Sequence, residues 1–177
     1  VHNVMIYQSM SGDAESGTST FTMKGGTLTG RNGDQIYVTN THSVITLEDV
    51  TITNQDASGR LLAILGNDAT RGWGTAGANG GQVDLTTTNQ TLTGAIEVDT
   101  VSTLNFTMGK GTNFTGTINI VKNAEGGTAV DNNAVITVEE GATWTLTGNV
   151  TITSLENKGT INFNGYTITL ADGTVLK

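Results

Sequence analysis

The stretch FTMKGGTLTG, at residues 21–30, has a counterpart in ITLEDVTITN at residues 45–54. In both, two short segments with apolar residues at alternate positions are joined by a tight turn. An apolar period of two is typical of β-strands and not of helices. The unit returns as VDLTTTNQTLTG, LNFTMGKGTNFTG and ITVEEGATWTLTG, which begin at residues 83, 104 and 136. The sequence therefore predicts a repeat whose first two strands, a and b, form in every copy.

A third short strand, c, is expected after most copies. It is predicted in IYV, LLAI, IEV and INI, at residues 36–38, 61–64, 96–98 and 118–120. Thr151 and Ile152 are its remnant in the last copy, and residues 5–8 form the c strand of a preceding turn, which gives Tyr7 and Tyr37 matching places. Antiparallel hairpins would favour Asn-Gly or Asp-Gly turns at regular strand boundaries, and the chain has them only at irregular places. We therefore expect an all-β chain that coils as a parallel β-helix, with three short strands per coil and about six coils.

Alternation assigns the residues of each strand to an inner and an outer face. We expect Phe21, Ile45 and Val83 to stack in register along the interior. The chain is interpreted as a single domain over residues 1–177, with residues 155–177 as the last coil and cap. Because open strand edges invite association, preceding coils of the same protein or a partner are expected to cover the N-terminal end. The other inner positions of the first two coils are Met23, Leu28, Ile36, Val38, Leu47 and Ile52.

The composition limits the classes of partner that the chain is expected to bind. Its net charge of −8 disfavours nucleic acid and anionic membrane surfaces. No run of 18 apolar residues is present, so membrane insertion through a helix is not expected. The 34 threonines favour strands, and cysteine is absent. GWGTAG is not followed by a helix or by Lys-Ser or Lys-Thr, so no nucleotide cofactor is expected.

The loop RGWGTAGANGG, at residues 71–81, is the first candidate binding site. It lies between a c strand and an a strand, as do the loops at residues 11–17 and 122–133, so all three are expected along one edge. The indole of Trp73 suits stacking on a sugar ring, while Arg71 and Asp68 suit hydrogen bonds to hydroxyls or a carboxylate. The alternative is that Trp73 fills a gap beneath the loop, whose glycines permit sharp turns.

Charged residues between strands b and c are the second candidate. Arg31 and Asp34 follow one b strand, and Asp56 and Arg60 follow the next, so the four are expected on one edge. Such a patch could hold a sugar through bidentate hydrogen bonds, and the alternative is a pair of exposed salt bridges.

Metal and catalytic chemistry have weaker signals. Asp13 and Glu15, with Asp34, could hold a weakly bound Ca²⁺, and no other metal or cofactor is expected. Polysaccharide lyases and hydrolases need clustered carboxylates or a calcium site with a base. The adjacent acidic pairs at residues 48–49 and 139–140 are interpreted as solvated turn residues, and His2 and His42 as surface residues. The sequence therefore predicts no enzyme.

Threonine also recurs on the outer face of strand b. The triplets TLT, TIT, TLT and TLT begin at residues 27, 51, 91 and 145, with NFT at residue 113. Regular threonine rows resemble the ice-binding surfaces of some β-solenoid antifreeze proteins, and the Asn113 break argues against such a lattice. The alternative is that threonine is the favoured outward residue of stacked strands.

Four longer segments carry a resemblance to a protein family. These are MIYQSMSGDAESG, GDQIYVTNTHSVITLEDVTITN, RGWGTAGANGG and INIVKNAEGGTAVDNNAVITVEEGATWTLTG. They resemble the C-terminal part of large secreted proteins of clostridial gut bacteria that are labelled carbohydrate-binding or adhesin-like. The resemblance implies a right-handed parallel β-helix in an extracellular or cell-surface bacterial protein.

These observations lead to three expectations of function. The first is a non-catalytic structural and adhesin-like module that binds a glycan or a host-surface ligand. The alternatives are a polysaccharide lyase or hydrolase-like enzyme and an ice-binding protein.

Overall fold

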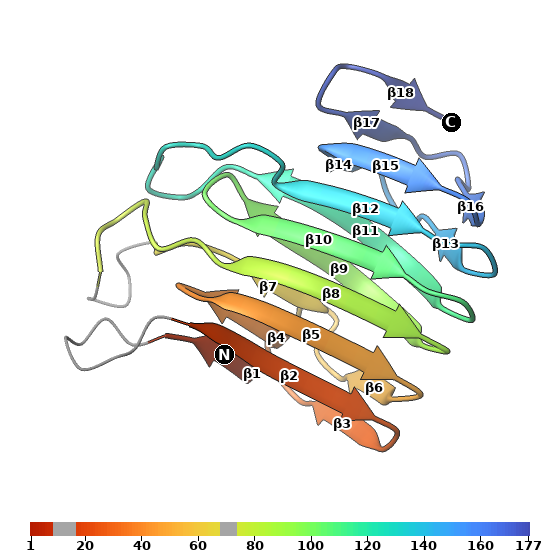
Figure 1. Ribbon diagram of the computed structural model, residues 1–177, viewed down its shortest axis with the longest axis horizontal. Coiled ribbons are helices and arrows are strands. Elements are labelled where there is room, and N and C mark those ends of the chain that lie inside the picture. The colour runs from red at the N-terminus through yellow and green to blue at the C-terminus, as the bar shows by residue number, and fades with distance from the viewer. Residues whose placement is uncertain (9–16, 68–73) are drawn as a thin grey trace.

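The computed structural model describes residues 1–8, 17–67 and 74–177. These residues form eighteen strands and no helix, arranged mainly in parallel sheets (Figure 1). The prediction of an all-β chain with parallel pairing is therefore confirmed, and the arrangement is compatible with a β-solenoid. Within the described residues, no helix is long and apolar enough to cross a membrane.

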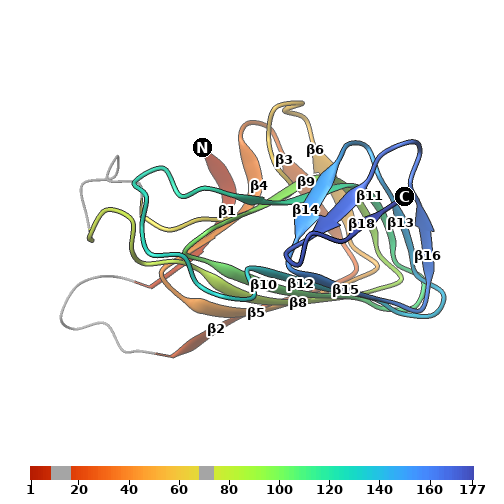
Figure 2. The same ribbon diagram turned by 90° about the horizontal axis from the view of Figure 1, so that it is seen from above.

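Two sheets face each other across the interior (Figure 2). The six-stranded sheet contains the a strands: β2 (Thr18–Lys24), β5 (His42–Glu48), β8 (Gln82–Thr88), β10 (Thr103–Met108), β12 (Ala134–Val138) and β15 (Ser154–Asn157). The ten-stranded sheet contains β1 (His2–Tyr7), β4 (Asp34–Thr39), β7 (Leu62–Ile64), β9 (Thr91–Asp99), β11 (Asn113–Val121), β13 (Thr143–Thr145), β14 (Val150–Ile152), β16 (Thr160–Asn162), β17 (Ile168–Leu170) and β18 (Val175–Leu176). All strand pairs are parallel except β17 with β18, which lies in the segment expected to form the cap.

The interior row of the six-stranded sheet differs from the predicted row at one position. Phe21 is level with Ile45, as expected, but Ile45 is level with Leu85, and Val83 is level with Ser43. The predicted place of Val83 is therefore wrong by two residues. Because side chains alternate with a period of two, this shift keeps Val83 and Leu85 on the same face. The row continues through Phe106, Ile136 and Leu155.

Two other predicted registers are wrong by the same interval. Tyr37 is level with Met5 and not with Tyr7. The b strand of the last repeat is Thr143–Thr145, whose central Trp144 is level with Phe114. The predicted strand at residues 145–147 therefore lies two residues too late, although both Trp144 and Leu146 are buried.

The core is made of inward-facing residues of both sheets. Trp144 is fully buried, its ring stacks on Phe114 at 5.9 Å, and its Nε1 donates to the carbonyl of Gly116 at 3.1 Å. Of the predicted inner residues, Ile36, Val38, Ile45 and Leu47 are buried, while Phe21, Met23, Leu28 and Ile52 are partly buried against the same core.

The b strands do not form one continuous ladder. β3 (Thr27–Gly30) and β6 (Thr51–Asn54) pair only with each other, whereas the b parts of β9 and β11 belong to the ten-stranded sheet. At this boundary, Oε1 of the buried Gln90 accepts from the Val50 amide at 3.0 Å, and its Nε2 donates to the Val50 carbonyl at 2.7 Å. One side-chain amide thus takes the place of a peptide group in the interrupted ladder.

Candidate functional site

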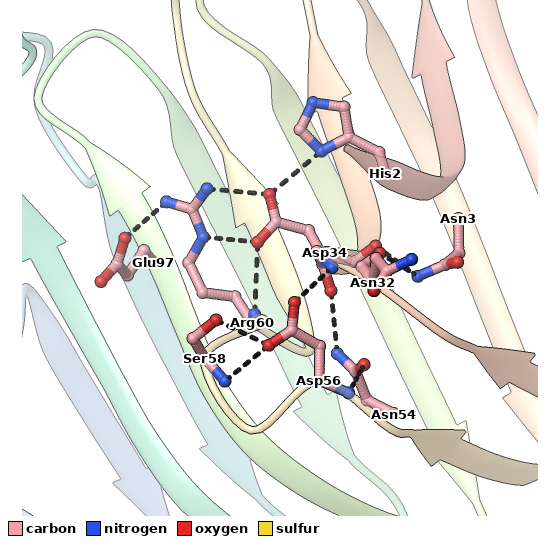
Figure 3. Close-up of polar contacts among 10 residues, drawn as sticks. His2, Asn3, Asn32, Asp34, Asn54, Asp56, Ser58, Arg60 and Glu97 are labelled. Carbon is pink, nitrogen blue, oxygen red and sulfur yellow. Dashed lines mark hydrogen bonds and ion pairs between the residues drawn. The ribbon is translucent and has the colours of Figure 1, made fainter.

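Two of the candidate residues, Asp34 and Arg60, lie in an ion-paired cluster on the outer face of the ten-stranded sheet or beside it. Arg60 donates from Nε and Nη2 to the two carboxylate oxygens of Asp34, both at 2.8 Å, and from Nη1 to Glu97 at 2.7 Å (Figure 3). The Nδ1 atom of His2 lies 3.0 Å from Oδ2 of Asp34, and the His2 ring stacks on the ring of Tyr37. We call Asp34, Arg60 and Glu97 the Arg60 clasp. It joins β4, the segment before β7, and β9.

The electrostatics of the clasp favour a structural role for Asp34 and Arg60. Burial of the Asp34 carboxyl raises its pKa, but the hydrogen bonds and positive charge of Arg60 outweigh burial and hold the pKa below 3.8. The hydrogen bonding that Arg60 donates to Asp34 is the main reason why the pKa of Arg60 is raised. The bidentate capacity of the guanidinium is therefore already used within the chain.

The other charged candidates of this edge, Asp56 and Arg31, form no ion pair with the clasp, although Asp56 lies beside it in Figure 3. Asp56 accepts hydrogen bonds from Ser58 and from the Gly33 amide, which lower the pKa of its carboxyl to about 2. Arg31 is exposed and forms no ion pair or hydrogen bond with the described part of the chain. Asp13 and Glu15 lie outside the described residues, and the residues that are described contain no cluster suited to a metal ion.

Asp68, Arg71 and Trp73 also lie outside the described residues. The described end of their loop packs against the loop that precedes β12. A side chain at Gly127 would meet the carbonyl oxygen of Gly77 at 1.7 Å, so these backbones are in close contact. The segments before β8 and β12 lie on the same side of the molecule in Figure 1, as the sequence predicts for two of its three loops.

A pocket of about 140 Å³ lies beside these loops, where β7, β9 and β11 end. We call it the loop-edge pocket. Asp99 in its wall is buried and accepts hydrogen bonds from the Gly66 amide at 2.7 Å and from Asn123 Nδ2 at 2.6 Å. Sequence reasoning missed Asp99, although a charged residue directly after an apolar c strand is a detectable signal. The pocket is lined by Arg60, Leu65, Gly66, Glu97, Asp99, Val121, Lys122, Asn123 and Ala124.

The histidines differ from each other in their surroundings. The side chain of His2 is only 14 % exposed, so its interpretation as a surface residue is wrong. His42 is 41 % exposed, and its Nε2 lies 2.7 Å from Asp84, while Thr18 Oγ1 lies 3.3 Å from its Nδ1. Hydrogen bonds from Asn105 and His42 lower the pKa of Asp84. This hydroxyl–imidazole–carboxylate chain lies on the outer face of the six-stranded sheet, where water screens its charges.

Comparisons with protein-family models, with curated proteins and with solved structures found no match to the chain.

Proposed function

We propose that the chain is a right-handed parallel β-helix, with three short strands per coil and about six coils, that acts as a non-catalytic adhesin-like module. The pairing of each a, b or c strand with its counterpart in a neighbouring copy supports the coil. The sequence resemblance supports a place in a bacterial extracellular or cell-surface protein. The proposed ligand is a glycan.

The loop-edge pocket is the main structural support for the proposal that the chain binds a glycan. Its lining combines the carboxylate of Glu97, the ammonium group of Lys122 and peptide groups, which suit sugar hydroxyls. Lys122 is exposed and forms no hydrogen bond within the part of the chain that the structure describes. The volume is below the roughly 300–1,000 Å³ of pockets for drug-sized ligands, so one sugar unit or the end of a glycan is the expected occupant.

The neighbouring loop supplies the remaining contacts in this proposal. Gly66 lines the pocket and is two residues before Asp68. Trp73 stacks on the sugar ring, and Arg71 and Asp68 bind its hydroxyls. Arg31 lies outside the pocket lining and contributes at most to the approach of the ligand.

A glycan array, probed with and without Ca²⁺, tests the proposal. We expect Trp73→Ala and Lys122→Ala each to weaken binding about tenfold or more, because both remove a central contact. Tyr166→Ala is the matched control, since Tyr166 is an exposed aromatic residue in the last coil. Absence of binding to every glycan would instead indicate a structural spacer. Release of reducing or unsaturated sugars would indicate the lyase or hydrolase alternative.

Ice binding remains a second candidate, because five threonines stand in register on the six-stranded sheet: Thr22, Thr46, Thr86, Thr107 and Thr137. On the b face, by contrast, the predicted rows are divided between β6 and β9, and Asn113 interrupts one of them. Thermal hysteresis that disappears in Thr86→Lys would favour this candidate. The absence of hysteresis would eliminate it.

A further inference from the structure

A second hollow lies on the b face, where the ladder is interrupted. It has a volume of about 330 Å³ and runs between β6 and the start of β9. We call it the β6–β9 groove. It is separate from the loop-edge pocket, which lies at the opposite end of β9. Its lining residues are Asp49, Val50, Thr51, Ile52, Asn89, Thr91 and Thr93.

The groove leaves peptide groups without a partner strand. Thr51 and Gln55 donate their amides toward the preceding coil, to Gly26 and Gly30. In a parallel strand, successive residues direct their N–H and C=O groups to opposite sides, so Ile52 directs its own toward β9. β6 and β9 belong to different sheets, so no strand pairing satisfies these groups. Gln90 bridges the gap only at its Val50 end.

At their closest approach, β6 and β9 leave no room for an inserted β-strand. Cα atoms of β6 and β9 come within 8 Å of each other. An additional strand between them would require a separation of about 9.6 Å, which is twice the usual interstrand spacing. A peptide that adds to the sheet therefore does not fit, and a ligand that lies over the groove and inserts only polar groups does.

The polar side chains around the groove are free to bind such a ligand. Within the described part of the chain, no hydrogen bond involves the side chains of Asp49, Thr51, Asn89, Thr91 or Thr93. All five residues are exposed. They provide a carboxylate, an amide and three hydroxyls, but no positive charge. In a chain with a net charge of −8, this lining disfavours anionic ligands.

We propose that the β6–β9 groove is a second binding site and that it takes a neutral oligosaccharide. Sugar hydroxyls both donate and accept hydrogen bonds, which matches the N–H and C=O of Ile52 as well as the threonine hydroxyls. Asp49 accepts from one hydroxyl in a charge-assisted hydrogen bond, and Asn89 contacts the ring from the neighbouring coil. This site is independent of the one proposed at the loop edge.

An NMR titration of the ¹⁵N-labelled chain tests the groove. The probes are cellopentaose, xylopentaose, mannopentaose and laminaripentaose, with trigalacturonate as an anionic probe. We expect at least one neutral probe, and not trigalacturonate, to shift the amides of Thr51, Ile52, Thr91 and Thr93. Thr91→Val, which keeps the shape of the side chain, should weaken binding about fivefold, and Asp49→Gly about tenfold or more. Glycine is chosen because Asp49 has a φ of 55°.

Thr29→Val is the matched control, because Thr29 is an exposed b-strand threonine outside the groove lining. It should leave the affinity of the groove unchanged. The inference is overturned if Thr91→Val and Asp49→Gly leave the affinity for the neutral probe unchanged. It is also overturned if none of the four neutral probes binds. Chemical-shift changes confined to the amides of Gly66 and Lys122 would rule out binding in the groove, but they would agree with the proposed function at the loop-edge pocket. Preferential binding of trigalacturonate, or of a Thr/Val-rich strand-forming peptide, at the groove would overturn its ligand class.

Discussion

The first two copies of the repeat and the two that follow differ in how the chain leaves strand b. In the first two, β3 and β6 end, and loops lead to the separate strands β4 and β7. In the next two, β9 and β11 run without interruption from the b face to the c face. The a and c strands pair across both regions, through β5 with β8 and β7 with β9. The interruption of strand pairing therefore affects only the face that contains the b strands.

The residue at the end of strand b differs among the copies. Gly94 and Gly116 stand at the bend of β9 and β11, and a side chain at Gly116 would meet the Gly94 carbonyl oxygen at 1.9 Å. In β3 and β6 the matching residues are Gly30 and Asn54. Asn54 takes part in the loop that follows β6. Its Oδ1 accepts from the Asp56 amide, and its Nδ2 donates to the Gly33 carbonyl. Glycine permits the bend of β9 and β11, but it does not by itself decide whether the strand continues, because β3 ends in a loop although it carries Gly30 at this position.

The comparison predicts unequal stability of the interior b row, and this gives the largest expected effect. Phe114→Ala in β11 should lower the free energy of unfolding by about 4 kcal/mol, because it removes a buried ring and leaves a cavity. Ile52→Ala, at the matching position beside the groove, should lower it by about 2 kcal/mol, since Ile52 is only partly buried. Urea unfolding followed by circular dichroism measures both.

Trp144→Phe separates packing from the hydrogen bond to Gly116. It keeps an aromatic ring against Phe114 and removes the Nε1 donor, so we expect a loss of about 1–2 kcal/mol. Equal losses for Phe114→Ala and Ile52→Ala would contradict the expected difference in packing between the continuous and the interrupted copies.

The Gln90 bridge at the boundary predicts a smaller effect. Gln90→Ala should destabilise the chain by about 2 kcal/mol, because it leaves the amide and carbonyl of Val50 unpaired. Hydrogen exchange of the Val50 amide should accelerate more than that of the Val83 amide. Gln82→Ala is the control, since Gln82 is an exposed glutamine at the start of β8. Unchanged protection of Val50 would mean that Gln90 does not hold the boundary together.

Much of the fold follows from the sequence, but its register does not. An apolar period of two identifies the strands and their inner faces. It cannot distinguish one register from another two residues away, because both keep the same side chains inside. The three errors, at Val83, Tyr7 and residues 145–147, all have this size. Packing decides between such registers, as Trp144 does by filling the interior place level with Phe114.

The candidate site could be predicted only where equivalent loops place residues together. Asp34 and Arg60 were expected on one edge, and they form an ion pair there. Glu97 and Asp99 escaped notice because their partners, Arg60 and Asn123, lie far away in sequence. The β6–β9 groove arises from an interrupted ladder, which depends on pairing between whole strands.

The smallest expected effect concerns the Arg60 clasp, which ties the first copies of the repeat to β9. Because the native pKa of Asp34 lies below 3.8, its ionised form stabilises the fold. This contribution is complete above the unfolded-state pKa and is lost as the pH falls through the lower native value. We expect the free energy of unfolding to fall as the pH is lowered below about 4, and urea unfolding at each pH measures this loss.

Asp34→Asn should flatten this part of the pH profile, because the variant cannot take up the proton. The variant will also be less stable at neutral pH, since Arg60 then has only Glu97 as a charged partner. The decisive readout is therefore the slope of the free energy of unfolding against pH, and not its value at one pH. Hydrogen exchange in one sample should show β1 and β4 losing protection on acidification before β11 and β14, because Asp34 and His2 lie in the first pair. If all four strands lost protection together, the clasp would not mark a boundary between the two regions, and the interruption of the b ladder would have no counterpart in stability.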